Sequence, residues 1–233
     1  MENIEEAIMN PRGGKKLPPL CFLPLGPGAW DTFQSIIQPM PHKQRKTDGF
    51  IIVETENFSC IGPTLGSPVA VMALEKAVAC EAKMILGFGW AGSIHPDYKI
   101  GDIVLVKSAL SEEGTSEHYI PGEKQPIAGQ EAYQFLKTRM QDKGLPFLEG
   151  NGWTIDAPYR ETRNKVLKYQ QNNIHVVEME ISSIYTVGKY RGVSVAAVVV
   201  ISDELTGSVW KSGYHNPLFQ ENIVKIARCF ITD

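Results

Sequence analysis

The chain has 233 residues, of which 43% are hydrophobic and 21% are charged, and its formal net charge at pH 7 is −3. This composition is typical of a globular protein long enough to bury a core, and the slight negative charge gives no reason to expect a nucleic-acid partner. No apolar stretch approaches the roughly 20 residues that are needed to span a bilayer, so we expect no membrane-spanning segment.

The four cysteines are far apart and form no Cys-x-x-Cys pair: Cys21, Cys60, Cys80 and Cys229. Their spacing favours reduced thiols over a disulfide framework or a metal site. We therefore expect a cytoplasmic protein with no bound metal or other cofactor.

The N-terminal part begins with a polar stretch. Residues 1–16 contain Pro11-Arg12-Gly13-Gly14 and are predicted to be a mobile leader, ahead of a single domain at residues 17–233. A first strand is expected at Leu20–Leu25. Phe50–Glu54 and Phe58–Ile61 read as a β-hairpin.

Two glycine-rich segments then follow predicted strands. Gly62–Gly66 precedes a helix from Pro68 to about Ala82, for which Ser67 is the expected N-cap. Met84–Phe88 reads as a buried strand that closes on a turn at Gly89–Gly92. Such turns leave backbone N–H groups free for an anion or a sugar hydroxyl, although tight connections also use glycine for steric reasons alone.

Further along, a strand is expected at Ile103–Val106 and amphipathic helices at Glu131–Lys143 and Asn216–Phe230. Between them, Gly114–Gln130 shows little periodicity and reads as a long loop. Loops of this length are often functional.

Acidic residues follow two apolar segments near the C-terminus. A short strand ends at Val177, a helix follows at Ile181–Tyr190, and Val193–Ile201 is an almost purely apolar strand. This order predicts a right-handed parallel crossover. Glu178–Glu180 and Ser202-Asp203 would then meet at the carboxyl ends of neighbouring parallel strands, where open α/β sheets bind ligands.

Each acid also has a structural interpretation. Glu178 suits the positive end of a helix dipole, and Asp203 suits the cap of a turn. For the whole chain, the alternation of strands and helices predicts an α/β fold, namely a three-layer α/β/α single domain. The hairpin predicts that its central sheet is mixed.

Several segments resemble the nucleoside phosphorylase family, which includes purine nucleoside phosphorylases, uridine phosphorylases and methylthioadenosine nucleosidases. The resemblance runs from about Leu20 to the C-terminus. Its most specific parts are Val177-Glu178-Met179-Glu180 and Ile201-Ser202-Asp203, supported by the glycine-rich segments and by Ile100–Val104. Glu112–Tyr119 and Thr154–Thr162 look closer to the uridine phosphorylases.

The resemblance implies a nucleoside-cleaving enzyme in which Glu180 positions the ribose and Asp203 assists the leaving base. The residues implied in ribose binding are Glu178, Met179, Glu180, Leu65 and His118. Those implied in base binding are Trp153, Pro158, Tyr159, Arg160, Ser202 and Asp203. Those implied at a phosphate or anion site are Gly28, Gly66, Gly89, Trp90, Ala91 and Arg45.

The sequence departs from the family at the phosphate site. Ala29 and Gly87 stand where the family places arginines, and Trp90 replaces a small hydroxyl residue. Arg45 and Lys46, which could come from a neighbouring subunit, are the expected replacement cations, and Lys43 is a further candidate.

Three functions remain open: a phosphorylase with inorganic phosphate as co-substrate, a nucleosidase that uses water, and a non-catalytic nucleoside-binding protein. The first is the interpretation that we carry forward. The resemblance also implies a small-molecule nucleoside as ligand and a homo-oligomer, either a dimer or a trimer of dimers.

Overall fold

The structure is a computed structural model that describes residues 7–207 and 209–231. Its ten strands are β1 (Leu20–Leu25), β2 (Lys43–Thr47), β3 (Phe50–Glu54), β4 (Phe58–Gly62), β5 (Met84–Ser93), β6 (Ile103–Ser111), β7 (Leu148–Thr154), β8 (Val176–Glu178), β9 (Ser194–Glu204) and β10 (Lys211–Ser212). The helices are α1 (Pro27–Ile37), α2 (Gly66–Ala79), α3 (Gln130–Asp142), α4 (Arg163–Gln171), α5 (Ile181–Arg191) and α6 (Pro217–Ile231), with short 3-10 turns η1 (Ser116–His118) and η2 (Pro158–Arg160).

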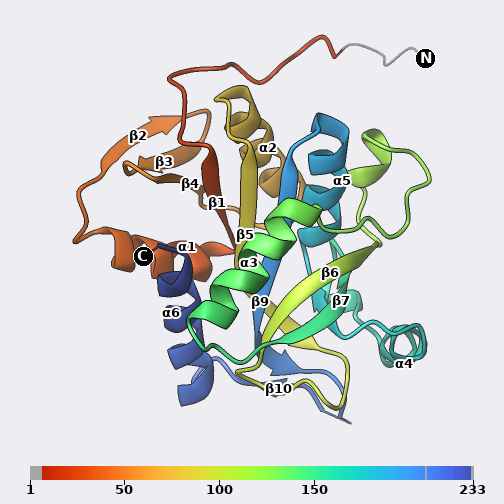
Figure 1. The fold of residues 1–233 in the computed structure, drawn as a ribbon. Coiled ribbons are helices and arrows are strands. Elements are labelled where there is room, and N and C mark those ends of the chain that lie inside the picture. The colour runs from red at the N-terminus through yellow and green to blue at the C-terminus, as the bar shows by residue number, and fades with distance from the viewer. Residues whose placement is uncertain (1–6, 208, 232–233) are drawn as a thin grey trace.

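The strands form one mixed sheet in the order β10-β9-β6-β7-β8-β5-β1-β4-β3-β2 (Figure 1). Strand β5 also pairs with β9, so β5, β9, β6, β7 and β8 close into a ring. Parallel pairs such as β1 with β5 coexist with antiparallel pairs such as β3 with β4. The predicted mixed sheet and the predicted hairpin are confirmed.

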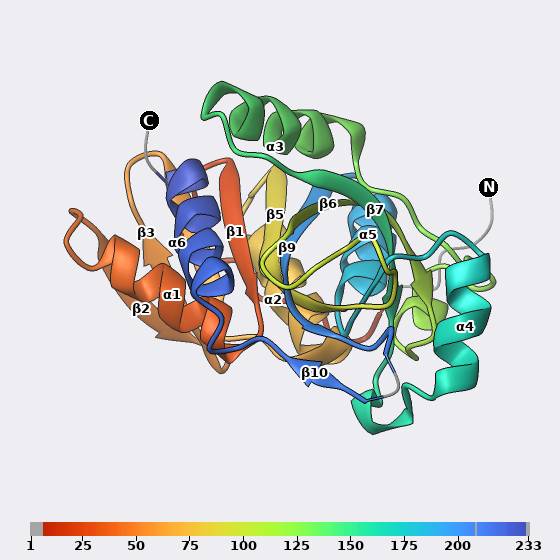
Figure 2. The ribbon, with the colours of Figure 1, turned by 90° about the horizontal axis from the view of Figure 1, so that it is seen from below.

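Helices cover both faces of the sheet (Figure 2). Helices α2 and α5 pack against each other on one side, while α1, α3 and α6 cover the other side. The predicted three-layer α/β/α architecture is therefore confirmed. Helix α4 lies beside these layers and packs on a small separate cluster around Trp153 and Val166.

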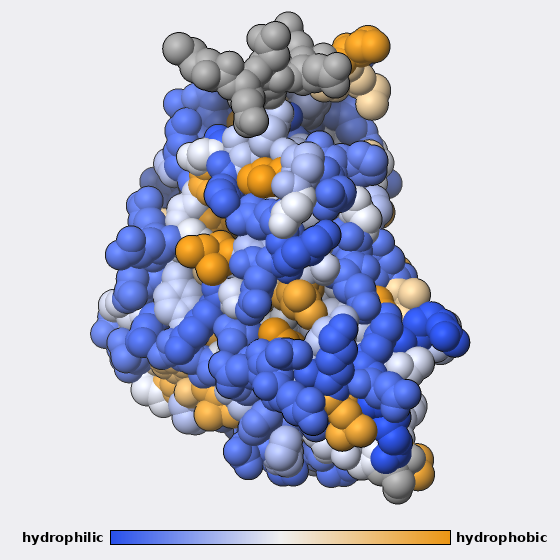
Figure 3. All heavy atoms as spheres, turned by 90° about the vertical axis from the view of Figure 1, so that its right-hand side faces the viewer, coloured by the Kyte–Doolittle hydropathy of each residue, from blue (hydrophilic) through white to orange (hydrophobic). Residues whose placement is uncertain are grey.

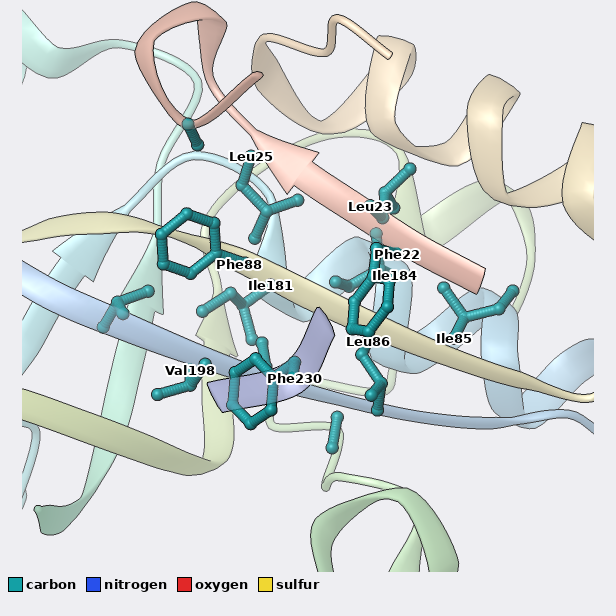
Figure 4. Close-up of a cluster of buried hydrophobic side chains, with 14 of the residues drawn as sticks. Phe22, Leu23, Leu25, Ile85, Leu86, Phe88, Ile181, Ile184, Val198 and Phe230 are labelled. Atoms are coloured by element: carbon teal, nitrogen blue, oxygen red, sulfur yellow. The ribbon is translucent and has the colours of Figure 1, made fainter. Parts of the chain in front are cut away.

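The core lies between the sheet and its helices (Figure 4). On one face of the sheet, Phe22 of β1 and Phe88 of β5 both pack against Phe33 of α1, and Phe22 also stacks on Phe230 of α6. On the other face, Ile184 of α5 lies against Gly87 of β5. The nearly continuous apolar sequence of β9 follows from its position, since helices cover it on both sides. This rigid core fixes the ends of β5 and β9, where the acidic residues lie.

Four sequence-based expectations on local structure were wrong. Strand β5 runs on through the glycines to Ser93, so Gly89–Gly92 is strand and not a turn. Helix α2 begins at Gly66 and ends at Ala79, with Leu65 and not Ser67 at its N-cap. Helix α1 begins directly after Gly26 and was not expected at all, because Gly-Pro-Gly reads as a turn; Pro27 instead occupies its first turn. Helix α4 was also missed.

A fifth error, beyond these four, concerns the parallel crossover. Strand β8 runs antiparallel to β5 while β9 runs parallel to it, so β8 and β9 run in opposite directions and do not pair. The three-residue β8 completes the ring by pairing with β7 and with the end of β5. The chain then returns through α5 to the other side of β5.

One face of the molecule is largely polar, and residues near the described N-terminus are bound to the rest of the domain. The face turned to the viewer in Figure 3 is mainly hydrophilic, with apolar side chains scattered over it. Lys15 pairs with Glu54, and the Arg12 carbonyl accepts a hydrogen bond from Lys76. Of the predicted mobile leader, residues 1–6 lie outside the described part, and its mobility stays a prediction. No helix in the described ranges is both long and apolar enough to cross a bilayer.

Candidate functional site

A pocket of about 700 Å³ opens at the carboxyl end of β5. Residues from both sides of the ring line it, together with the N-terminal ends of α1 and α2. The lining residues that the sequence had suggested are Leu65, Trp90, Ala91, Pro158, Tyr159, Glu178, Met179, Glu180, Ser202 and Asp203.

Gly92 explains why the two acidic segments converge. It is the register partner of Val177 on β8 and of Asp203 on β9. A Cβ atom at this position would lie 2.6 Å from a Leu205 methyl group and 3.0 Å from Asp203 Oδ2. Only glycine lets the two strands approach β5 this closely. The predicted meeting of Glu178–Glu180 with Ser202-Asp203 is therefore present, although β8 pairs with β5 antiparallel and only β9 pairs with it in parallel.

The two glutamates of one wall have different partners. Glu178 Oε2 accepts hydrogen bonds from the backbone N–H groups of Glu180 (2.6 Å) and Ile181 (2.7 Å), and Oε1 accepts from the Thr154 hydroxyl. Glu178 thus holds the first turn of α5 in place. Glu180 Oε1 accepts a hydrogen bond, 2.6 Å long, from the N–H of Gly66 at the start of α2. Its remaining acceptor capacity faces the pocket.

Burial governs the charge of this pair. Glu178 is 6% exposed and Glu180 is 5% exposed. Burial raises the pKa of Glu178 well above its usual range, and the nearby Glu180 charge raises it further. Burial also raises the pKa of Glu180, although backbone N–H groups of Gly66 and Met179 oppose the shift. The wall therefore carries less negative charge near neutral pH than two ordinary carboxylates would.

The opposite wall holds a second pair of acids. Asp203 is 8% exposed, and both of its oxygens accept hydrogen bonds: Oδ1 from Ser202 Oγ at 2.5 Å and Oδ2 from Trp210 Nε1 at 2.7 Å. Glu161, directly after η2, lines the same pocket. Burial, followed by the charge of Asp203, raises the pKa of Glu161 to about 7.

The mouth of the pocket is apolar and aromatic. Leu65 is 55% exposed and Tyr159 fully exposed, and both border the opening together with Pro158.

Met179 lies between the two glutamates in the chain, and its carbonyl accepts a hydrogen bond from the Ser67 hydroxyl. Ser67 therefore anchors α2 to the glutamate wall instead of capping the helix.

Three predicted ligand-binding residues do not line this pocket. Trp153 is fully buried, donates to Glu112 Oε2 and packs edge-on against Tyr169, so it belongs to the core and not to a base site. His118 lies in η1, and Arg160 ends η2 on the surface. Neither is among the residues that form the cavity.

At the predicted anion site, a side chain fills the space beside Gly28 that an anion would need. The Trp90 indole lies directly over Gly28, where a Cβ would come within 1.9 Å of Trp90 Cη2. The indole is held by edge contacts with Phe219 and Tyr214, at ring-centre distances of 5.8 and 6.4 Å.

The other residues predicted at the anion site have different roles. Gly89 and Ala91 pair with β9 inside the sheet, and the N–H of Gly66 is bound to Glu180. Arg45 lies on the edge strand β2, where it pairs with Glu54 and donates to the Lys15 carbonyl. It therefore supplies no cation to the pocket of its own chain.

The two positions where arginines were expected face the core. Ala29 is fully buried in α1. A side chain at Gly87 would meet Ala197, Ile184 and Leu25 within 3.3 Å. An arginine at either position has no path into the pocket without rearrangement of the core.

Of the lining residues that were not predicted from the sequence, Glu161, Trp210 and Tyr214 are the ones whose side chains carry polar groups. Glu161 belongs to the segment Thr154–Thr162 that resembles the uridine phosphorylases, in which Arg160 was the residue predicted to bind the base. Trp210 and Tyr214 follow β9 in the chain, and no periodicity in the sequence shows that this segment folds back over Asp203.

The acidic and basic side chains that line the described pocket are all carboxyl groups. Four carboxyl groups line it, from Glu161, Glu178, Glu180 and Asp203, and among the described lining residues there is no lysine, arginine or histidine. An uncharged ligand with hydrogen-bond donors, such as sugar hydroxyls, fits this chemistry better than a dianion does.

Known proteins are similar to this chain in sequence. The chain is 30% identical over 151 residues to an uncharacterized protein of Acanthamoeba polyphaga mimivirus, covering 64% of this chain and 57% of that protein. It is 27% identical over 179 residues to the purine nucleoside phosphorylase of Plasmodium falciparum, covering 74% and 72% of the two chains.

Two solved structures have the same fold. The purine nucleoside phosphorylase of Toxoplasma gondii, solved in complex with immucillin-H, matches with a TM-score of 0.80 at 19% identity, over 96% of this chain and 97% of that one. The uridine phosphorylase of Vibrio fischeri matches with a TM-score of 0.79 at 17% identity, over 91% and 89%. The family model described as the phosphorylase superfamily matches residues 41–231. The chain therefore belongs to the phosphorylase superfamily, as its resemblance to nucleoside phosphorylases implied.

Proposed function

We propose that this chain cleaves the N-glycosidic bond of a ribonucleoside. The observation that supports it most directly is the convergence of Glu180 and Asp203 on one pocket, from opposite sides of β5. Cleavage of this bond develops positive charge on the ribose and negative charge on the base. A pocket with carboxyl groups at both ends can serve both needs.

Glu180 is the residue that we assign to the ribose. Its carboxyl group has one oxygen fixed by Gly66, which leaves the other to accept a bond from a ribose hydroxyl. Negative charge at this position also stabilises the cationic ribose of the transition state. Glu178 supports Glu180 by fixing the backbone between them.

The base is assigned to the wall of Asp203, Ser202 and Trp210, with Tyr159 and Pro158 at the mouth. The relatives named above as purine nucleoside phosphorylases favour a purine base. For the acceptor of the ribosyl group, the family's reaction makes inorganic phosphate the first candidate, with ribose 1-phosphate as product.

Water is the second candidate, and one specific observation favours it. The Trp90 indole fills the space over Gly28, and the lining supplies no cation to a phosphate dianion. Phosphorolysis then needs a cation from a second copy of the chain, whereas hydrolysis needs none. We accordingly propose a homo-oligomer, a dimer or a trimer of dimers, for the phosphorylase alternative.

We also propose a cytoplasmic location, which the four buried free cysteines support.

One assay tests the proposal. Purified protein is incubated with inosine, adenosine, guanosine and uridine, with and without phosphate, and the free base, ribose and ribose 1-phosphate are measured. Phosphate-dependent ribose 1-phosphate supports the phosphorylase, and free ribose without phosphate supports the hydrolase. If no base is released from any nucleoside under either condition, the proposal is wrong and the fold serves nucleoside binding alone.

A further inference from the structure

The pair of acids on the Asp203 wall is asymmetric. Both oxygens of Asp203 accept hydrogen bonds, from Ser202 and from Trp210. Within the described residues, no hydrogen bond or ion pair reaches the carboxyl group of Glu161, although it is partly buried and lines the pocket. Asp203 is thus held as a hydrogen-bond acceptor by the chain, whereas the carboxyl group of Glu161 is available to a ligand in the pocket.

The charged and titratable groups around Glu161 are chiefly acidic. Asp203 and Tyr214 approach it from the C-terminal segment, and Glu178 and Glu180 face it across the pocket. Arg160 and Arg163 belong to the same stretch of chain, but neither forms an ion pair with it in the described structure; Arg163 donates instead to the Gly207 carbonyl. Desolvation and the charge of Asp203 both favour the protonated form of Glu161.

When two carboxyl groups share a site and their environments differ in this way, the one whose protonated form is favoured is the candidate general acid. We propose that Glu161, and not Asp203, is the general acid that protonates the leaving base in the reaction proposed above. Asp203 keeps Glu161 protonated and accepts hydrogen bonds. This assignment rests on the proposed function, since it gives Glu161 a role only where a glycosidic bond is broken.

The proton and electron balance is simple. As the bond between C1′ and the base nitrogen breaks, its electron pair stays with the base, and the Glu161 carboxyl proton moves to a base nitrogen. C1′ gains a bond to the oxygen of the acceptor, either water or inorganic phosphate, and the acceptor releases one proton to solvent. Glu161 is left as a carboxylate and regains a proton from solvent before the next turnover.

The test compares two leaving groups. Wild type, Glu161→Gln, Glu161→Asp and Asp203→Asn are assayed with inosine, whose base needs protonation, and with p-nitrophenyl β-D-ribofuranoside, whose leaving group does not. Loss of a general acid costs roughly 10²–10⁴-fold. We therefore expect Glu161→Gln to lose at least about 100-fold in kcat/KM for inosine but less than about threefold for the activated riboside. Glu56→Gln, in the β3–β4 turn, is the matched control and should behave as wild type.

The pH profile gives an independent readout. For wild type, kcat/KM for inosine should fall above pH 7, where Glu161 loses its proton. This limb should vanish in Glu161→Gln, return in Glu161→Asp and move to lower pH in Asp203→Asn. Equal losses on both substrates in Glu161→Gln, or loss of the limb in Asp203→Asn alone, would overturn the assignment. If wild type cleaves neither substrate, the proposed function fails and the assignment fails with it; circular dichroism of each variant identifies a folding defect.

Discussion

The two sides of the pocket differ in how far they suit the reaction of a phosphorylase. On one side, four carboxyl groups surround the space for a nucleoside, and each of Glu178, Glu180 and Asp203 is positioned by hydrogen bonds from the chain. On the other side, the Trp90 indole covers Gly28, and the positions that would carry arginines face the core. The groups that act on the glycosidic bond and those that bind the acceptor can therefore change independently within one fold.

After the loss expected for Glu161→Gln, the largest expected effect is that of Glu180→Ala, also on the carboxylate side. Glu180→Ala removes the group that we assign to a ribose hydroxyl, and a charge-assisted hydrogen bond of this type contributes about 1.5–3 kcal/mol. We expect kcat/KM to fall at least about tenfold, with little change in the midpoint of urea unfolding.

Glu54→Ala is the matched control for that variant. Glu54 is equally buried, at 8% exposure, but it pairs with Lys15 and Arg45 at the edge of the sheet. The Glu54→Ala variant should be less stable than the wild type but keep its activity. An inactive but equally destabilised Glu180→Ala would instead mark Glu180 as a structural residue.

The carboxylate side was also the part that the sequence predicted best. Glu178–Glu180 and Asp203 follow apolar strands directly, so their place at one sheet edge was readable from local pattern even though the strand direction was not. Whether a three-residue strand pairs parallel or antiparallel depends on its neighbours in the closed ring, and β7 and β5 lie far from β8 in the sequence.

The Trp90 side could not be predicted in the same way. Gly26-Pro27-Gly28 and Gly89-Trp90-Ala91-Gly92 both read as turns, yet one begins helix α1 and the other is buried strand. Only tertiary packing brings Trp90 onto Gly28. Trp153 shows the same limit, because its burial against Tyr169 depends on helix α4, which has few apolar residues to reveal it.

A substitution at Gly28 tests whether Trp90 is fixed there. In Gly28→Ala the new methyl group would lie 1.9 Å from Trp90 Cη2 and 2.5 Å from Cζ2, so the indole has to move. Overpacking of this kind costs about 1–3 kcal/mol, which should appear as a lower midpoint of urea unfolding. In the double variant Gly28→Ala, Trp90→Ala the penalty of the first change should disappear. An unchanged midpoint for Gly28→Ala would show that the indole leaves this space readily and that phosphate has access to it.

The smallest effect concerns Glu178 and the dependence of stability on pH. The pKa of Glu178 is raised from an ordinary value of 4.5 to about 8 in the folded chain, chiefly by burial. Between these values the folded state binds more protons than the unfolded state, so this contribution to stability is complete below pH 4.5 and is lost as the pH rises towards 8. Glu178→Gln keeps an acceptor oxygen for Glu180 N–H and Ile181 N–H, but its NH2 group cannot accept the hydrogen bond that the Thr154 hydroxyl donates. It should cost about 1 kcal/mol at pH 5. That cost should shrink or reverse at pH 9, because the wild type then buries a charge that the variant lacks.

Thermal unfolding of wild type and Glu178→Gln at both pH values measures the difference, and the control Glu56→Gln should show no pH-dependent change in stability. A cost that grows with pH would mean that the backbone donors at the start of α5 require an ionised Glu178.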